Sequence, residues 1–546
     1  MVNTTAPKTI FFLLGVLLII SFLTRFYFLF NHLQAVTHDE ADIYYSGYIV
    51  SQTGSDQFNN KLFLTTGFLT AKPSIPIYIS AFAWHFLEPR NTLNARLPFT
   101  IINSFTPVLL FLLLFFITKN RLFAFFVFTI FNFSPWFSYL SVTGYEAPIC
   151  LFFILLGSLI LFMRWNIFFK YLLFIGTSFL AFNSYMGIKP VFPFILFVSL
   201  LISQPIPFNK INISKRKIIG IVLFSLILTC CFLFLNYKIP NTSLLKEDSE
   251  HTLVFLNKPK IDNELWYANL TSSNAGFMNR FISNKITIPF YTFFSNYMES
   301  FNLHTIFFSG DSSVYGTAGR IGLFYLTDFV FLILGLYSLR DLKNSKIYIL
   351  MTLFLFGGLP IAFSSLPPTI PFRGLILLIP YITLIATGYL YVYKKYVNHL
   401  TLLFLIGLII VNTFYYWTLF STRIKVLFAE PWHIDEKNVI QKVHTLAQSN
   451  PDIQYTIYVK EPKPTFLLFG FYQVKEVSAF NTRIEKNFYN WNNITFKAGC
   501  PSTTPAEAKK EVIIVKTLDC PKIDLLQKTV IVPATNKSGN DYVMIH

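Results

Sequence analysis

The chain has 546 residues, of which 53% are hydrophobic and only 13% are charged, and its mean hydropathy is +0.52. A soluble globular domain carries about 25% charged residues, so the composition excludes an ordinary soluble protein and indicates a polytopic membrane protein. The net charge of +17 fits loop lysines and arginines that set topology. No basic soluble module that would bind nucleic acid is present in the sequence.

Apolar runs long enough to cross a hydrocarbon layer of about 30 Å recur along the chain. The first run is too long for the apolar core of a signal peptide, so we expect a retained helix there. A shorter run at 75–87 cannot span and is predicted to lie at the interface or to re-enter the membrane. We predict about eleven transmembrane helices, near 10–30, 98–118, 122–138, 147–163, 168–184, 190–204, 217–236, 321–339, 346–363, 372–392 and 399–419.

Lysine and arginine gather in every second loop of this pattern, and positively charged loops stay in the cytoplasm. The N-terminus is then cytoplasmic, and the outer side holds a loop at 31–97, a second loop at 237–320 and the tail. We therefore expect a multi-pass protein of the plasma (inner) membrane with its C-terminal domain outside. The positive loops lie at 119–121, 164–170, 210–217, 340–346 and 393–399.

The tail has a different pattern. Residues 435–448 have the period of an amphipathic helix, whereas 466–472 fits either a helix or a strand. Strands are predicted at 455–460, 511–517, 529–533 and 541–546. We therefore expect a transmembrane domain at 1–420 and a small exofacial α/β domain at 421–546. Cys500 and Cys520 in this domain are able to pair if it lies in an oxidising compartment.

An acidic stretch, His38-Asp39-Glu40 followed by Asp42, comes directly after the first predicted helix. One interpretation is a helix cap, with Asp39 at the N-cap and Asp42 three residues later in the capping-box position. The other is a carboxylate at the membrane surface that deprotonates a hydroxyl or amine while a lipid-linked substrate lies in the bilayer. The pattern alone leaves both interpretations open.

Other charged residues lie at the outer ends of predicted helices. Glu146 begins one helix, where an acid is favourable at the N-terminus but is costly at membrane depth and often functional. Lys72 precedes the interfacial run, and Lys189 and Arg373 lie in outer loops. Each of these basic residues is either an interfacial anchor or a contact to a lipid phosphate.

The segment at 304–326 closes the large outer loop. Its Gly, Ser and Asp residues predict an ordered, turn-rich structure, with Arg320 at the entry of the next helix. The sequence has no CxxC, HExxH or DxD spacing of metal ligands, and no P-loop or GxGxxG. We therefore expect neither a metal ligand set nor a cofactor, although a divalent metal is not excluded by sequence, and no soluble nucleotide.

Four motifs follow one another along the first part of the chain. An acidic pair follows the first helix, KP stands at 72–73, RLP at 96–98 opens the second helix, and SPWFSYLSVTGYEA at 134–147 leads into a later one. In this order and spacing they resemble the GT-C integral-membrane glycosyltransferases, in the bacterial protein-mannosyltransferase and aminoarabinose-transferase branch. The resemblance covers residues 10–420 and implies a GT-C-like α-helical membrane fold.

The resemblance implies roles for particular residues. Asp39 matches the candidate catalytic base of the family, and Glu146 matches its second acid. Glu40 and Lys72 are implied to bind substrate, with Lys72 at the lipid phosphate; the aminoarabinose transferases carry Glu before that lysine, where this chain has Ala71. Further substrate-binding candidates implied in this way are Tyr145, Lys189, His304, Arg320 and Arg373.

The implied function is an inverting glycosyltransferase that moves a sugar from a polyprenyl-phosphate donor to an exofacial acceptor, which is a protein, a glycolipid or a cell-wall glycan. A transporter or flippase for lipid-linked sugars would place charges at mid-membrane and show two similar halves, whereas this chain gathers its acids on the outer side and has no repeat. A polymerase or ligase with a diphosphate-linked donor, which would favour several outer arginines, and a non-catalytic scaffold are further alternatives.

Overall fold

The computed structural model describes most of the chain, and residue contacts divide it into two compact units. Unit 1 comprises Met1–Phe28 and Phe99–Trp417, and unit 2 comprises Leu29–Pro98 and Thr418–His546. The segment Leu29–Pro98, which the sequence places in the membrane domain, thus belongs to the same unit as the tail. The described residues are 7–32, 35–62, 65–88, 90–204, 214–237, 252–271, 281–313, 315–317, 321–340, 344–396, 399–474, 476–485, 489–501, 511–516, 519–520, 528–533 and 542–545.

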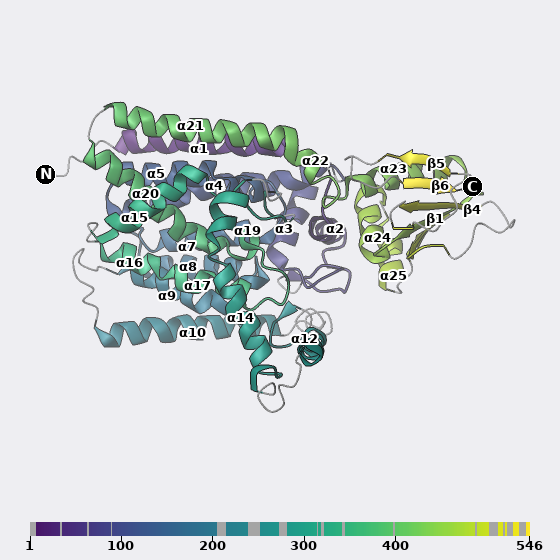
Figure 1. The fold of residues 1–546 in the computed structure, drawn as a ribbon, viewed down its shortest axis with the longest axis horizontal. Coiled ribbons are helices and arrows are strands. Elements are labelled where there is room, and N and C mark those ends of the chain that lie inside the picture. The colour runs from purple at the N-terminus through teal and green to yellow at the C-terminus, as the bar shows by residue number, and fades with distance from the viewer. Residues whose placement is uncertain are drawn as a thin grey trace. The chain divides into compact units, whose positions relative to one another are not determined.

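Unit 1 is built from apolar helices (Figure 1). In the described part of the chain, seven helical segments are long and apolar enough to cross a membrane, and five more apolar helices are shorter. Each of the eleven predicted runs coincides with helical structure, so the predicted polytopic helical fold is confirmed. The helices are α1 (Pro7–Asn31), α4 (Thr92–Thr118), α5 (Arg121–Phe133), α6 (Pro135–Leu140), α7 (Glu146–Ile160), α8 (Ile167–Phe182), η2 (Met186–Val191), α9 (Phe192–Ser203), α10 (Lys215–Tyr237), α12 (Lys258–Thr271), α14 (Thr287–Glu299), η3 (Thr305–Ser309), α15 (Leu326–Leu339), α16 (Ser345–Met351), α17 (Leu353–Gly357), α18 (Leu359–Ala362), α19 (Ile370–Arg373), η5 (Leu375–Leu377), α20 (Leu378–Lys395) and α21 (His399–Leu419).

Several of the predicted helices are interrupted, including the run at 372–392, which is divided among α19, η5 and α20. Two of the interruptions have a cause in single residues. The run at 122–138 is divided between α5 and α6 at Ser134, whose side chain accepts the N–H of Phe137 and so caps the second helix. The run at 346–363 is divided among α16, α17 and α18, around Gly357, Gly358 and Pro360. Both interruptions fall at residues that cap or weaken helices, which a hydropathy window does not register.

Helices α15 and α20 pack with their backbones in contact. A Cβ on Gly388 would overlap the carbonyl oxygen of Phe331, and a Cβ on Gly335 would overlap the carbonyl oxygen of Leu384. Small residues allow such close approach between membrane helices. Tyr389 stacks on Phe331 with ring centroids 3.7 Å apart. Backbone proximity and ring stacking together fix this crossing.

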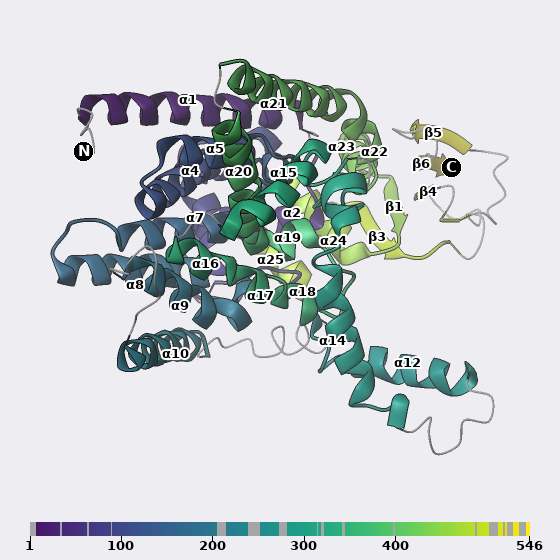
Figure 2. The same ribbon diagram turned by 60° about the vertical axis from the view of Figure 1, so that its left-hand side comes forward.

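Two further helix pairs define the outline of unit 1. Helices α1 and α21 run side by side (Figure 1), and Tyr27 stacks on Trp417 with centroids 4.3 Å apart. Helices α12 and α14, from the large outer loop, lie beside each other at the edge of the unit (Figure 2). Their surface carries exposed aromatic side chains, including Trp266 and Tyr291.

Unit 2 combines a six-stranded sheet with helices from both of its chain segments (Figure 1). The strand order is β2-β3-β1-β4-β6-β5, with β1 parallel to both β3 and β4 and the remaining pairs antiparallel. Helix α24 packs against β1 and β3, and α2 packs against α3 and α24. The elements are α2 (His38–Thr53), α3 (Ser74–Trp84), η6 (Phe420–Ile424), α22 (Lys425–Leu427), α23 (Ile434–Ser449), β1 (Gln454–Val459), α24 (Pro462–Gln473), α25 (Val477–Glu485), β2 (Asn490–Trp491), β3 (Ile494–Ala498), β4 (Glu511–Lys516), β5 (Lys528–Val532) and β6 (Tyr542–Ile545).

The predicted elements of the tail are present, and the helix α25 and two short strands are additional. The four predicted strands correspond to β1, β4, β5 and β6, and the amphipathic helix corresponds to α23. The segment 466–472, which fitted either element, lies in the helix α24, and the short strands β2 and β3 were not predicted. Cys500 and Cys520 form a disulfide, so the pairing that the sequence left open is present.

Candidate functional site

Helix α2 carries the acidic stretch in its first turns. Its N-cap is Thr37, whose Oγ1 accepts the N–H of Glu40 at 3.2 Å. The helix begins at His38, so Asp39 is not the N-cap and Asp42 is not in the capping-box position. The capping interpretation of these two acids is therefore wrong. Because a threonine already satisfies the helix end, the carboxylates have other partners.

Asp39 forms an ion pair with Lys72. The Nζ of Lys72 lies 2.6 Å from Oδ1 of Asp39, a short charge-assisted hydrogen bond. The Asp39 side chain is 37% exposed, whereas that of Lys72 is 10% exposed. The structure thus joins two residues that the sequence proposed for different roles, and it leaves the carboxylate within reach of a solute.

Asp42 holds the loop that leads to Lys72. Its carboxylate accepts the backbone N–H of Phe68 at 2.6 Å and of Leu69 at 3.2 Å. Gly67 passes so close to this carboxylate that a Cβ would overlap it. Burial raises the pKa of Asp42 to about 6, although the charge of Lys72 and the backbone N–H groups oppose this rise. Asp42 is therefore a positioning residue for Lys72.

Glu40 is locked in a buried ion pair. Its Oε2 lies 2.7 Å from Nη2 of Arg96, and its Oε1 accepts both the Nε–H of Arg96 at 3.0 Å and the hydroxyl of Tyr44 at 3.0 Å. The side chains of Glu40 and Arg96 are both fully buried. Arg96 also donates to the carbonyl of Ala35 at 2.7 Å and lies over the ring of Trp432 at 4.8 Å. These contacts favour a structural role for Glu40, and its predicted contact with substrate stays a prediction.

Arg96 was not among the candidate residues, although the RLP motif that contains it formed part of the resemblance. Its partner is 56 residues away in the sequence, so no local pattern predicts this pair. The motif was the signal that pointed to it.

In unit 1 an aromatic cluster draws several candidate segments together. Tyr145 lies 4.8 Å from Tyr315 and 5.7 Å from Phe372, and Phe372 lies 4.7 Å from Tyr315 and 5.0 Å from Tyr185. The cluster therefore joins the segment that leads into α7, the segment before η2, the loop after η3, and α19. Glu146 and Lys189 lie in the helices that follow the first and second of these segments, α7 and η2, and Arg373 lies in α19 itself.

The charged candidates around this cluster have separate surroundings. Glu146 is the first residue of α7, as predicted, and is buried. Lys189, in η2, lies over the ring of Phe182 at 5.3 Å. Arg373 donates to the carbonyl of Pro367 at 3.1 Å, and burial raises the pKa of nearby Asp311 although the charge of Arg373 opposes this rise.

The last two candidates come from the segment 304–326. His304 is exposed and contacts Ser309, at 3.1 Å between Nδ1 and Oγ, and the ring of Phe308. Arg320 lies outside the described residues, so its predicted place at a helix entry stays a prediction. The helix that follows, α15, begins at Leu326 with Tyr325 as its N-cap.

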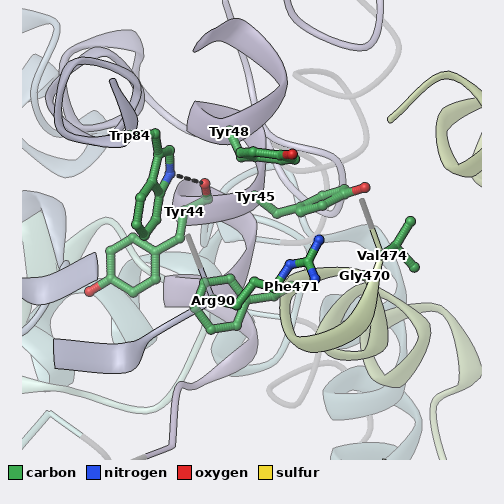
Figure 3. Close-up of a pocket in the computed structure, with 8 residues that line it drawn as sticks. All are labelled: Tyr44, Tyr45, Tyr48, Trp84, Arg90, Gly470, Phe471 and Val474. Atoms are coloured by element: carbon green, nitrogen blue, oxygen red, sulfur yellow. Dashed lines mark hydrogen bonds between the residues drawn. The ribbon is translucent and has the colours of Figure 1, made fainter. Parts of the chain in front are cut away.

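An aromatic pocket lies between α2, α3 and α24 (Figure 3). The indole N–H of Trp84 donates to the carbonyl of Tyr44 at 3.0 Å across its upper part. The cavity volume is about 10 Å³, room for about one water molecule and far below the roughly 300–1,000 Å³ of typical ligand pockets. It does not have the size of a site for a polyprenyl-linked sugar. The lining residues are Tyr44, Tyr45, Tyr48, Trp84, Arg90, Gly470, Phe471 and Val474.

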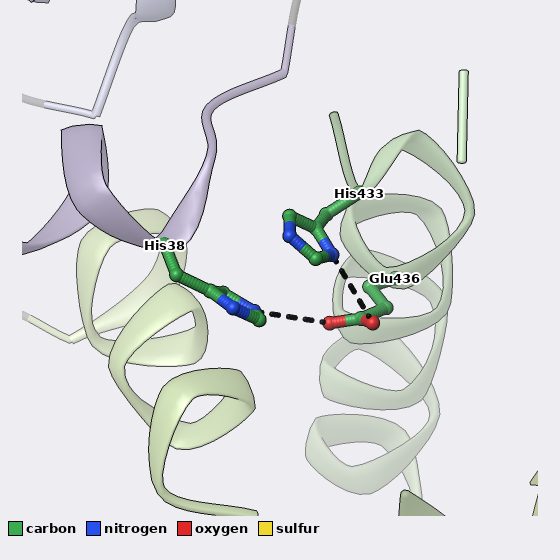
Figure 4. Close-up of side chains that lie close together, drawn as sticks. All are labelled: His38, His433 and Glu436. Carbon is green, nitrogen blue, oxygen red and sulfur yellow. Dashed lines mark hydrogen bonds and ion pairs between the residues drawn. The ribbon is translucent and has the colours of Figure 1, made fainter. Parts of the chain in front are cut away.

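A second cluster of polar side chains was not predicted from the sequence. His38, at the start of α2, lies beside His433 and Glu436, which belong to the beginning of α23 (Figure 4). The two histidines are 395 positions apart, so no ligand spacing is visible in the sequence. The local signal that remained was the pair His433 and Glu436, three residues apart.

Comparisons with known proteins give remote structural likenesses. No protein-family model and no curated protein matches the chain. Among solved structures, ArnT from Cupriavidus metallidurans is similar in its apo state (11% identity, TM-score 0.47) and bound to undecaprenyl phosphate (10% identity, TM-score 0.46), each covering 99% of this chain and 98% of ArnT. The oligosaccharyltransferase of Archaeoglobus fulgidus is similar at 11% identity and TM-score 0.43, over 92% of this chain and 68% of its own.

Proposed function

We propose that this protein is an inverting glycosyltransferase that moves a sugar from a polyprenyl-phosphate donor to an acceptor outside the plasma (inner) membrane. The observation that carries the proposal is the ion pair between Asp39 and Lys72 at 2.6 Å, with its carboxylate partly exposed. The neighbouring acids have other partners: Glu40 forms an ion pair with Arg96, and Asp42 accepts hydrogen bonds from a backbone loop. Asp39 is thus the acid of this stretch that is accessible for chemistry.

Donor binding changes the partner of Lys72. A phosphate that reaches the lysine ammonium competes with Asp39 and forms charge-assisted hydrogen bonds. These contacts stabilise the negative charge that grows on the leaving phosphate. Asp39, released from its ion pair, is then able to take a proton from the acceptor. The resting ion pair in this way keeps both groups in place until the donor arrives.

The transfer is a single displacement. The acceptor oxygen or nitrogen forms a bond to the anomeric carbon while its proton passes to Asp39. The bond from that carbon to the phosphate oxygen breaks, and its electron pair leaves with the polyprenyl phosphate. Attack from the side opposite the phosphate inverts the configuration of the sugar.

The residues of unit 1 enter the proposal through the family resemblance. Glu146 is the second acid, and Lys189 and Arg373 are further phosphate contacts. Tyr145 and His304, together with Arg320, are proposed substrate contacts. The acceptor is a protein, a glycolipid or a cell-wall glycan, and the bilayer holds the donor chain.

The test is substitution of Asp39 in purified protein supplied with radiolabelled polyprenyl-phosphate sugars and native membranes. Removing a general base lowers the rate by about 10²–10⁴-fold, so Asp39→Asn is expected to lose label transfer while the protein remains folded in detergent. The matched control is Asp262→Asn, which removes the carboxylate of an exposed ion pair to Lys285 at 3.2 Å and is expected to transfer normally. Full activity of Asp39→Asn would refute the assignment.

A companion variant separates donor binding from proton removal. Lys72→Met is expected to raise the KM for the donor, because the phosphate loses a cation, whereas Asp39→Asn lowers kcat. Movement of labelled lipid across vesicles without transfer of label to any acceptor would instead support the transporter alternative.

A further inference from the structure

The group formed by His38, His433 and Glu436 has the geometry of a metal-ligand set. Its three candidate ligand atoms all lie within 4.8 Å of one another. The Nδ1 of His433 is 3.3 Å from Oε1 of Glu436, and the Nε2 of His38 is 3.7 Å from Oε2. Ligands about 2.1 Å from a tetrahedral zinc ion lie roughly 3.4 Å apart. The separations from the two imidazole nitrogens to the two carboxylate oxygens are close to that spacing, so a small movement would allow all three side chains to reach one ion.

His433 is within hydrogen-bond distance of Glu436, but the contact from His38 to the same carboxylate is poorly explained as a hydrogen bond. The 3.7 Å separation exceeds hydrogen-bond length, and the buried Nε2 of His38 has no hydrogen-bond partner. The two imidazole rings stack with centroids 3.8 Å apart at 21°. The side chains are about one-fifth exposed, at 22%, 21% and 18% for His38, His433 and Glu436.

The backbone conformation at the start of α23 orients two of these side chains toward the third. His433 has φ 55° and ψ 34°, the left-handed region that residues other than glycine seldom adopt. Glu436 follows three residues later in the first turn of α23, so both point to one side of the helix start, toward His38 (Figure 4). Thr465 donates to Oε2 of Glu436 at 3.3 Å. Such an outer hydrogen bond orients a ligating carboxylate.

We propose that His38, His433 and Glu436 bind a divalent transition-metal ion of the zinc class. Two imidazole nitrogens and one carboxylate oxygen form a donor set that suits zinc, whereas calcium and magnesium prefer oxygen ligands alone. The ion would join the start of α2 to the start of α23 and so tie the first outer loop to the tail. Because Asp39 follows His38, the ion would also fix the helix turn that presents the proposed base; this last consequence rests on the proposed function.

Metal binding is tested on the full-length protein without any substrate. The purified protein is stripped with a chelator, loaded with Zn²⁺, desalted and analysed for bound metal, and in parallel it is titrated with Co²⁺, whose visible absorption reports tetrahedral coordination. We expect one equivalent of zinc, a tetrahedral cobalt spectrum and a higher Tm with metal than without it. Absence of stoichiometric zinc in the unsubstituted protein would overturn the proposal, whatever the transferase assay gives.

Three variants locate the ion. Thr465→Ala is expected to weaken affinity by about 10–100-fold, as loss of an outer partner does, and Glu436→Gln and His433→Ala are expected to weaken it more. The control is His444→Ala on the same helix, which removes a histidine that contacts Gln448 and not the proposed site. Equal zinc affinity in Glu436→Gln, His433→Ala and the control would overturn the assignment of the ligands.

Discussion

The acidic stretch of α2 and the crossing of α15 with α20 are stabilised in different ways. In the first, each carboxylate has its own cation or backbone partner, and Glu40 with Arg96 is fully buried. In the second, glycines bring two helix backbones together, and what matters is the absence of side-chain volume at Gly335 and Gly388. The charged region is sensitive to the loss of a group, and the helix crossing is sensitive to the gain of one.

The largest effect is expected when one side of the buried ion pair is removed. Arg96→Met leaves the carboxylate of Glu40 buried without its cation, which costs about 3–5 kcal/mol in comparable cases. Thermal unfolding in detergent, with limited proteolysis of the loop and tail, measures the loss in unit 2. The double variant Glu40→Met with Arg96→Met removes both charges and is expected to be more stable than Arg96→Met alone. If the two costs simply add, the ion pair is not what stabilises this region.

The next effect depends on pH and concerns Asp42. Its pKa is about 6 in the folded protein because it is buried, and an unfolded aspartate has a pKa of about 3.9. The folded protein therefore takes up a proton between about pH 6 and pH 4 that the unfolded chain does not. The stability from this group is complete below about pH 4 and is lost as the pH rises through 6, and the difference corresponds to about 3 kcal/mol.

Comparison with Asp42→Asn isolates this contribution because asparagine does not titrate. As the pH falls from 7.5 to 4, the unfolding free energy of the unsubstituted protein is expected to rise relative to that of Asp42→Asn. Denaturation curves at several pH values provide the measurement. A difference that stays constant with pH would show that Asp42 is not buried in this way.

The helix crossing gives a smaller effect of the opposite kind. Gly388→Ala places a Cβ against the carbonyl of Phe331, and overpacking of this kind costs about 1–3 kcal/mol. Gly407→Ala on α21 is the matched control, since a Cβ there meets nothing within 4 Å and alanine favours the helix by about 0.5–1 kcal/mol. The thermal stability of the two variants is expected to move in opposite directions, and equal shifts would contradict the crossing.

The smallest stability change is expected at the proposed catalytic pair. The partly exposed ion pair between Asp39 and Lys72 contributes about 0–1 kcal/mol, so Asp39→Asn and Lys72→Met should unfold close to the unsubstituted protein. The same melting experiments record this. A loss as large as that of Arg96→Met would mean that the pair is structural and that reduced transfer in these variants reflects unfolding.

The sequence predicted the helices far better than the partners. Hydropathy located every one of the eleven apolar runs, because the lipid requirement acts on each segment separately. The breaks at Ser134 and around Gly358 were not visible, since they depend on single residues. Likewise, alternating apolar residues predicted four strands of the tail. The two residues of β2 are too few to show the pattern, and β3, whose sequence ITFKA does alternate, was overlooked.

In the candidate site, too, the sequence predicted individual residues better than the contacts between them. The resemblance selected Asp39 and Lys72 separately, yet nothing in the sequence indicated that they touch. The partners of Glu40 and His38 lie 56 and almost 400 positions away. Residue spacing predicts only contacts between neighbours along one helix or strand. It therefore could not predict pairs of residues that are distant in sequence and meet only when unit 2 folds.

Unit 2 also has a consequence for the order of biosynthesis. The backbone N–H of Val36 donates to the hydroxyl of Tyr472 at 3.1 Å, across 436 positions of the chain. At about 5–20 residues per second, roughly 20 to 90 s separate the synthesis of these two residues. During that interval the segment that carries α2 has neither α23 nor α24 to fold against. The turn that carries Asp39 is therefore completed only after α23 and α24 have been synthesised.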